Sequence, residues 1–163
     1  TIELKGSIPE SLRSLIGNRI YGCDDCQLVC PWNKFARITN EDDFHVRNGL
    51  DAVSLVALFS WDQETFETQL AGTPIRRIGH QQWLRNIAVG LGNAPYSAEI
   101  VSALQARATN PSKKSANNEM PINMGTNVKL SCKQAIMAQH PENKFKSVNA
   151  FGRCFFINRI LQN

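Results

Sequence analysis

Apolar residues recur at helical spacing through the middle of the chain, from residue 49 to residue 108. Val53, Val56 and Phe59 return every three residues, as on the inward face of an α-helix. The clearest helix presents five apolar side chains on one face: Trp83, Leu84, Ile87, Ala88 and Leu91. Gly92 and Asn93 follow this run and predict the end of the helix.

Polar residues at the expected helix starts divide this region into short pieces. Helix N-caps are predicted at Asp51, at Ser60 (with Gln63 in a capping-box position), at Thr73 before Pro74, and at Ser97. Helices of ~10 residues joined by turns of ~2–6 residues favour stacked antiparallel pairs. The repetition between pairs is too weak to establish a solenoid from the letters alone.

The two ends of the chain differ from this middle region. Residues 1–48 predict one helix, starting after Pro9 and stopping at Gly17, and then hold three cysteines within eight positions. Residues 109–163 show little periodicity; only 129–139 and 150–161 are expected to form helix or strand. We therefore expect a cysteine-containing segment over 1–48, a helical region over 49–108 and an irregular tail over 109–163.

Charge separates the tail from the rest. The 163 residues carry a net charge of +4, but residues 1–108 have 10 Lys and Arg against 12 Asp and Glu, whereas residues 109–163 have 8 against 2. The basic balance thus comes from the tail and is weak evidence for an anionic partner. The shift from Arg to Lys and the nine Asn of the tail suggest the hypothesis that it has another, non-native origin, such as a frame change or a fusion.

Composition excludes one class and suggests that the chain is part of a larger protein. No apolar run approaches the ~20 residues that span a bilayer, so no membrane-spanning segment is expected. The chain opens with Thr1, inside sequence typical of a folded domain, and without a secretory leader. We expect it to be a piece of a longer protein.

The chemical signal is Cys23-Asp-Asp-Cys26-Gln-Leu-Val-Cys30-Pro31. The spacing C-x2-C-x3-C-P matches the end of the bacterial ferredoxin run. In that run, two cysteines separated by two other residues bind one iron–sulfur cube. The Cys-Pro cysteine of that run ligates the other cluster in two-cluster ferredoxins. Ile20 stands where the first cysteine of the run would be, so the missing thiolate must come from elsewhere.

Three clustered cysteines also occur in sites other than iron–sulfur centres. Structural zinc would need a second Cys/His pair, and the isolated His45 and His80, like Cys132 and Cys154 in the tail, are poor candidates. Disulfides are disfavoured by the odd count of five cysteines. A radical-generating cluster has the same gaps in reverse order, and three clustered thiols make purely structural cysteines improbable. Iron–sulfur ligation is the favoured interpretation.

Several motifs in order resemble one family. GNRIYGCDDCQLVCPWNKFA, preceded by TIELKGSIPESLRS and followed by GLDAVSLVALFSW and IRRIGHQQWLRNIAVGLGNAP, resembles the C-terminal part of the epoxyqueuosine reductase family. The resemblance runs from Thr1 to about residue 108. These bacterial enzymes perform the last step of queuosine synthesis in tRNA, and the family is cobalamin-dependent, with two [4Fe–4S] clusters and HEAT-like helical pairs at the C-terminus.

The resemblance assigns roles to residues of this chain. Cys23 and Cys26 would bind one [4Fe–4S] cluster together with two upstream cysteines, and Cys30 would complete the other. Lys5 and Asp25 are candidates to border cobalamin. The family's catalytic acid and most of its corrin pocket would lie before Thr1, so a fragment of this length is expected to be inactive on its own.

The expected partners are the tRNA anticodon loop and an unidentified electron donor. Arg76, Arg77 and Arg85 are the candidate tRNA contacts, with a solvated helix face as the alternative. Trp61 and Trp83 could stack on bases but are better explained as core. We expect a cytoplasmic monomer with no membrane contact.

The predicted architecture is mainly α: a partial ferredoxin-type 2[4Fe–4S] segment, HEAT-like helical pairs and an irregular tail. Two alternative functions remain open. One is an electron-transfer ferredoxin-type module that serves a different partner. The other is a helical interaction module whose cysteines bind structural zinc.

Overall fold

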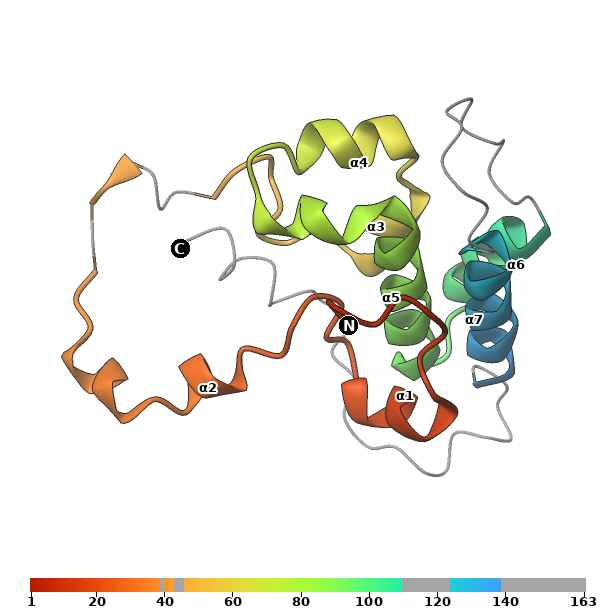
Figure 1. The fold of residues 1–163 in the computed structure, drawn as a ribbon, viewed down its shortest axis with the longest axis horizontal. Coiled ribbons are helices and arrows are strands. Elements are labelled where there is room, and N and C mark those ends of the chain that lie inside the picture. Colours follow the sequence, from red (N-terminus) through yellow and green to blue (C-terminus); the bar gives the residue numbers. More distant parts are fainter. Residues whose placement is uncertain (39, 43–45, 110–123, 139–163) are drawn as a thin grey trace.

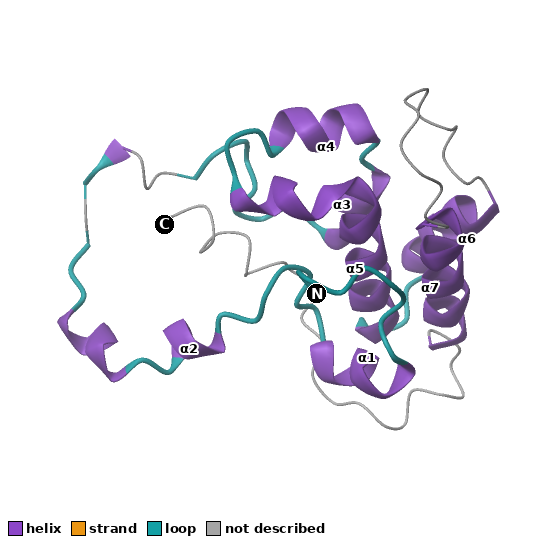
Figure 2. Ribbon diagram, viewed as in Figure 1, coloured by secondary structure: helices purple, strands orange, loops and turns teal. Residues whose placement is uncertain are grey.

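The computed structural model describes residues 1–38, 40–42, 46–109 and 124–138, and these residues form helices joined by loops (Figures 1 and 2). The α-helices are α1 (Glu10–Ile16), α2 (Asp25–Leu28), α3 (Leu55–Ser60), α4 (Gln63–Gln69), α5 (Gly79–Asn93), α6 (Ala98–Thr109) and α7 (Met124–Ala138). Two 3-10 helices are η1 (Pro31–Phe35) and η3 (Pro74–Ile78). The expectation of a mainly helical chain is confirmed. None of the helices in these ranges combines the length and the apolar character needed to cross a membrane.

Helix α5 is the centre of the fold: α1, α3, α4 and α7 contact it, and α6 packs against α7 and α3 (Figure 1). The five apolar residues predicted to face inward, from Trp83 to Leu91, are indeed buried. The prediction of a single apolar face is nevertheless too narrow, because every residue from Gln82 to Leu91 is buried, polar ones included. A helix surrounded by neighbours needs apolar or hydrogen-bonded side chains all round.

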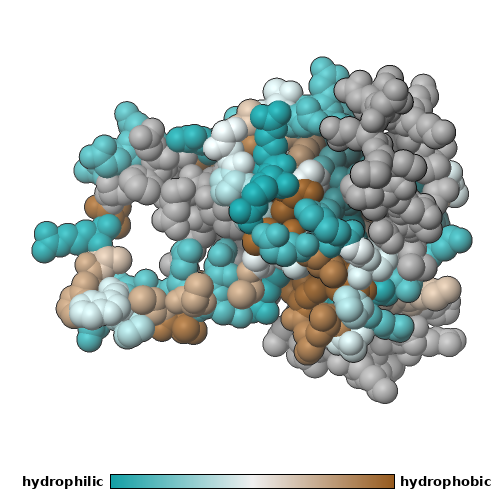
Figure 3. Space-filling model, in the orientation of Figure 1, coloured by the Kyte–Doolittle hydropathy of each residue, from teal (hydrophilic) through white to brown (hydrophobic). Residues whose placement is uncertain are grey.

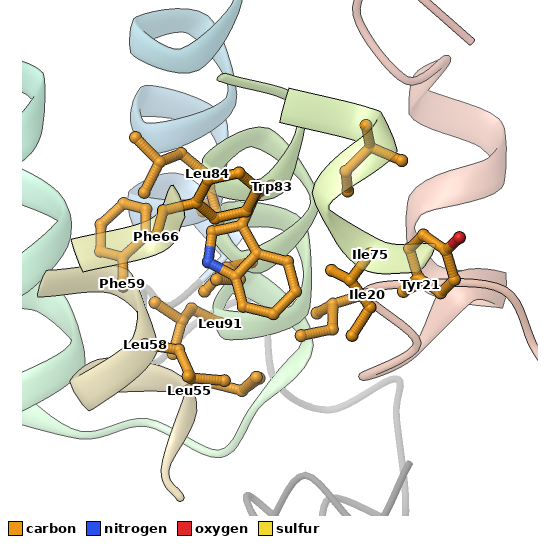
Figure 4. Close-up of a cluster of buried hydrophobic side chains, with 14 of the residues drawn as sticks. Ile20, Tyr21, Leu55, Leu58, Phe59, Phe66, Ile75, Trp83, Leu84 and Leu91 are labelled. Atoms are coloured by element: carbon orange, nitrogen blue, oxygen red, sulfur yellow. The ribbon is translucent and has the colours of Figure 1, made fainter. Parts of the chain in front are cut away.

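The core collects aromatic and aliphatic side chains around Trp83, which lies close to Phe66 (ring centroids 5.8 Å apart) and stacks with Trp61 (6.4 Å) (Figure 4). Trp83 is fully buried and Trp61 half-buried, so the interpretation of both as core residues is confirmed. Truncating a buried aromatic side chain to alanine typically costs about 3–5 kcal/mol.

Two predicted helix caps are wrong by a few residues. Helix α3 begins after Ser54, whose Oγ accepts a hydrogen bond from the Ala57 N–H (3.1 Å), and not after Asp51. Helix α4 begins after Asp62, whose carboxylate accepts from the Thr65 N–H (2.8 Å), and not after Ser60. In each case a second capping residue stands within three positions, and the burial of the following apolar residues selects between them.

The N-terminal third of the chain contains a helix, a buried stem and a long excursion. Helix α1 starts after Pro9 and ends at Gly17, as predicted, but contains no buried residue. The stem, Ile20 and Tyr21, is buried against η3 and α5. From residue 22 the chain then runs away from the bundle through α2 and η1 (Figure 1). This excursion carries Cys23, Cys26 and Cys30 and forms the cysteine loop.

The expectation of an irregular tail fails for residues 124–138. This segment forms α7, which packs against α5 and α6. Cys132 is fully buried in the common core, and a Cβ atom built on Gly92 would lie 3.0 Å from the Cα atom of Ala135. The element expected over 129–139, helix or strand, is a helix that starts earlier, at Met124. The second predicted element, over 150–161, lies outside the described residues.

Candidate metal centre

The three cysteines of the motif lie on the excursion and carry free thiols. Cys23 precedes α2 and is exposed, Cys26 is exposed within α2, and Cys30 is half-buried directly before η1. Pro31 occupies the first position of η1, where its missing N–H is not needed. The sequence thus places each thiol at or beside a short helical turn.

The backbone around Cys23 is unusual. Gly22 has φ +64°, in the left-handed region that glycine enters without a steric penalty. Asp24 also has a positive φ, of 51°, which is uncommon for a residue with a Cβ atom. The Asp24 carbonyl accepts hydrogen bonds from the N–H groups of Gln27 and Leu28, both at 3.0 Å. These two conformations turn the chain sharply on either side of Cys23.

The loop is held to its stem by contacts from distant parts of the chain. The Tyr21 hydroxyl donates to the Pro74 carbonyl (3.0 Å), and the Gly22 N–H donates to Oγ1 of Thr1 (3.1 Å). An ion pair between Arg19 and Asp25 (2.8 Å) bridges the loop across Cys23. This pair is about half exposed, so its contribution to stability is small, on the order of 0.5 kcal/mol.

The donor set fits a cluster whose remaining ligands come from elsewhere. Thiolates are the preferred protein ligands of iron–sulfur clusters, and two of the three thiols are exposed, so they can meet ligands from outside the loop. Among the described residues, no three His, Cys, Asp or Glu side chains are gathered to hold one metal ion.

Apolar side chains on the excursion are exposed (Figure 3). Trp32 is 73% exposed and lies beside Phe35, with ring centroids 5.4 Å apart and ring planes inclined by 42°. The Lys34 ammonium lies 4.9 Å from the centre of the Phe35 ring. Large exposed aromatics next to a metal-binding motif are typical of a surface that meets another protein segment or ligand.

The two residues predicted to border cobalamin lie on the surface. Lys5 is exposed in the N-terminal segment, and Asp25 is exposed in α2 and paired with Arg19. Both are accessible to a ligand.

The three arginines predicted to contact tRNA are in different environments. Arg76 and Arg77 are exposed on η3, and Arg77 forms an ion pair with Glu3 (3.1 Å). Arg85 is only 2% exposed, and its guanidinium donates to the backbone carbonyls of Leu4 and Gly6. The prediction that Arg85 contacts tRNA is therefore wrong for this structure, because the side chain is buried and its donors are occupied.

The other two candidates that the structure describes, His80 and Cys132, are buried in the core. His80 is buried and its Nε2 bonds the Trp61 carbonyl (2.9 Å), while burial raises the pKa of the Cys132 thiol to about 11. His45, His140 and Cys154 lie outside the described residues.

Sequence reasoning missed Asn86, which is buried beside Arg85 and donates hydrogen bonds to both the N-terminal segment and the stem. Its only signal was a polar residue inside an apolar helix run.

The comparison with known families agrees with this geometry. Residues 1–33 match the 4Fe-4S double cluster binding domain. The match contains Cys23, Cys26, Cys30 and the stem, so this part of the chain is similar to a domain that binds two iron–sulfur clusters.

Similarity to individual proteins extends further along the chain. Over 107 residues, 66% of its length, the chain is 61% identical to the epoxyqueuosine reductase of Xanthomonas campestris and 62% identical to that of Aliivibrio fischeri. Over the same length it is 59% identical to the epoxyqueuosine reductase of Escherichia coli. The resemblance expected from the motifs is confirmed. The chain spans about 30% of the length of these relatives, and no solved structure matches it.

Proposed function

We propose that this chain is part of an enzyme that reduces epoxyqueuosine to queuosine in tRNA. The observation that carries the proposal is the identity of about 60% to epoxyqueuosine reductases over 107 residues, which are 66% of the chain. Removing the epoxide oxygen consumes two electrons and two protons, and the oxygen leaves as water. A bound cobalamin would supply a reducing centre for such a step, and iron–sulfur clusters would supply the electrons one at a time.

Within this scheme the residues of the chain hold and tune the clusters. Cys23 and Cys26 ligate one [4Fe–4S] cluster and Cys30 ligates the second, with the other ligands supplied by cysteines outside this chain. The hydrogen bonds and burial around the stem set the position and the solvent exposure of the sulfur atoms, which influence the reduction potential. Lys5 and Asp25 stand exposed on the same N-terminal third, where they border the cobalamin.

The tRNA partner is assigned to the outer face of η3. Arg76 and Arg77 are exposed there, and guanidinium groups bind phosphate oxygens in bidentate fashion. Arg85 is left out of this surface because it is buried. The anticodon loop, which carries the modified base, is the part of the tRNA that we place against it.

The remaining parts of the proposal concern the setting of the enzyme. The helices α3 to α7 are arranged as HEAT-like pairs, a separate electron donor feeds the clusters, and the protein works as a cytoplasmic monomer. The family resemblance supports each of these statements, and each is open to direct measurement.

The test is turnover by the full-length protein. Purified without oxygen and supplied with cobalamin and a chemical reductant, it should convert epoxyqueuosine in tRNA to queuosine, detected as a loss of 16 mass units in the digested nucleoside. Replacing both Arg76 and Arg77 by alanine should raise KM for tRNA and flatten its salt dependence, whereas kcat should change little. The Arg47→Ala variant, which removes one exposed arginine outside η3, serves as a control.

Two results would contradict the proposal. Clusters that are present and reducible in a protein that binds no cobalamin and leaves the nucleoside unchanged would favour an electron-transfer module for another partner. Zinc in place of iron and sulfide would favour a helical interaction module.

A further inference from the structure

The central helix α5 contains a buried polar pair, Arg85 and Asn86, in a run of apolar residues. Arg85 is 2% exposed and Asn86 is 1% exposed. The Nε and Nη2 atoms of Arg85 donate to Oδ1 of Asn86 at 3.1 and 2.9 Å. Burial of a guanidinium is costly unless its hydrogen bonds are satisfied, and apolar residues of similar volume often stabilise a core equally well. We therefore expect the pair to have a role other than stabilising the core.

The other side-chain hydrogen bonds of the pair go to backbone carbonyls outside the helix, in the N-terminal segment and in the stem. Arg85 donates to the carbonyls of Leu4 and Gly6, both at 2.6 Å, and to that of Thr1 at 3.2 Å. Asn86 Nδ2 donates to the same Thr1 carbonyl (3.0 Å) and to the Ile20 carbonyl (2.8 Å). Asn86 thus joins the N-terminal segment to the stem of the cysteine loop.

The stem leads directly into the thiols. Ile20 lies three residues before Cys23, and the Gly22 N–H between them bonds the Thr1 hydroxyl (3.1 Å). The path from Asn86 to the first cysteine is consequently a short chain of directed hydrogen bonds. The apolar contacts of Ile20 with α5 fix its depth, and the Asn86 amide donates to its carbonyl and so constrains the direction in which the loop leaves the bundle.

We propose that Asn86 is a positioning residue for the iron–sulfur centre: oriented by Arg85, it locks the stem of the cysteine loop and so sets where Cys23 and Cys26 present their sulfur atoms. The inference rests on the cluster ligation proposed above and does not depend on the substrate. Residues outside the ligand sphere that orient ligands typically change metal affinity by about 10- to 100-fold when they are replaced.

The test is the Asn86→Asp variant of the full-length protein. Aspartate has nearly the same size and still pairs with Arg85, but its carboxylate cannot donate to the Thr1 and Ile20 carbonyls. We expect the cluster held by Cys23 and Cys26 to be lost to a chelator about tenfold faster than in the unsubstituted protein. The electron paramagnetic resonance signal of the reduced cluster should change its shape.

Asn93 offers a matched control on the same helix. Its Nδ2 also donates to two backbone carbonyls, those of Arg13 (2.6 Å) and Gly17 (2.8 Å), at the end of α1. The Asn93→Asp variant should lower the melting temperature as Asn86→Asp does but should leave the rate of cluster loss and the spectrum unchanged. Equal effects of the two variants on the cluster, or no effect of either, would overturn the proposal.

A second variant covers the case in which Asn86→Asp does not fold. Asn86→Ser keeps one short donor and carries no charge. Its rate of cluster loss should lie between the rates of the unsubstituted protein and of Asn86→Asp. If Asn86→Asp does not fold, the rate for Asn86→Ser should be several-fold above that of the unsubstituted protein. An unchanged rate would contradict the positioning role. Failure of the proposed substrate looks different: the unsubstituted protein then holds its clusters but leaves epoxyqueuosine intact, and the contrast between Asn86 and Asn93 persists.

Discussion

At the scale of single residues, chemical type did not decide function. Arg85 is the residue type that binds phosphate, yet it lies in the core and bonds backbone carbonyls. Periodicity could not reveal this, because a helix with neighbours on all sides has no solvent face on which to place a polar residue. The cysteine spacing was more informative, since ligand spacing is imposed by the geometry of the cluster itself.

His80 makes the stability of the core depend on pH. Burial lowers the pKa of this imidazole, and its neutral ring donates from Nε2 to the Trp61 carbonyl. Because the pKa in the folded state lies below that in the unfolded state, protonation favours unfolding, and stability falls as the pH drops below about 6.5. Melting temperatures measured from pH 8 to pH 5 should show this decline, and the His80→Gln variant should show a shallower one.

Asp62 provides the check on this pH window. Hydrogen bonds from Thr65 lower the pKa of its carboxyl, so its own contribution is lost only as the pH falls below about 4. The same slope in His80→Gln as in the unsubstituted protein would show that another group is responsible.

At the scale of elements, the sequence predicted which helices exist better than where they begin. The turn signals Thr73-Pro74 and Ser97 preceded η3 and α6 as expected. The starts of α3 and α4 were misplaced because several capping residues lie within reach, and the choice depends on which apolar residues enter the core. Short-range signals do not contain that information.

Two glycines of α5 provide a test of helix packing. A Cβ atom on Gly92 would lie 3.0 Å from the backbone of Ala135 in α7, whereas one on Gly90 would meet mainly the movable end of Leu55 at 3.2 Å. Alanine is favoured over glycine within a helix by about 1 kcal/mol. We expect Gly90→Ala to be close to neutral and Gly92→Ala to be destabilising by about 1–3 kcal/mol, because overpacking against backbone is not relieved by a rotamer change.

Denaturant titration of the two variants measures this difference. A Gly92→Ala protein as stable as Gly90→Ala, or more stable, would show that α7 does not pack closely on α5 in solution.

At the scale of the whole molecule, the boundaries 1–48, 49–108 and 109–163 stay predictions. Residues 1–33 match a 4Fe-4S double cluster binding domain, and helices α3 to α6 occupy most of the middle region. The composition of the tail indicated irregular structure, yet α7 contributes Cys132 and Ala135 to the core. Composition reports average polarity, whereas docking depends on a few small apolar residues that meet Gly92.

Cys132 makes the docking of α7 measurable. Burial raises its pKa to about 11, so at pH 8 only about a thousandth of the thiol is ionised and able to react. In the folded protein, iodoacetamide should modify Cys132 roughly a hundredfold more slowly than after addition of denaturant, as followed by peptide mass spectrometry. Equal rates under the two conditions would mean that α7 does not cover this thiol.

The central claim is that three thiols of one loop serve two different iron–sulfur clusters. It is tested most directly by iron and sulfide analysis with electron paramagnetic resonance on the full-length protein and its single Cys→Ser variants, prepared without oxygen. Cys23→Ser and Cys26→Ser should lose the same signal, Cys30→Ser should lose a different one, and Cys132→Ser should retain both. Loss of one common signal in all three loop variants, or an iron content that none of them changes, would contradict the claim.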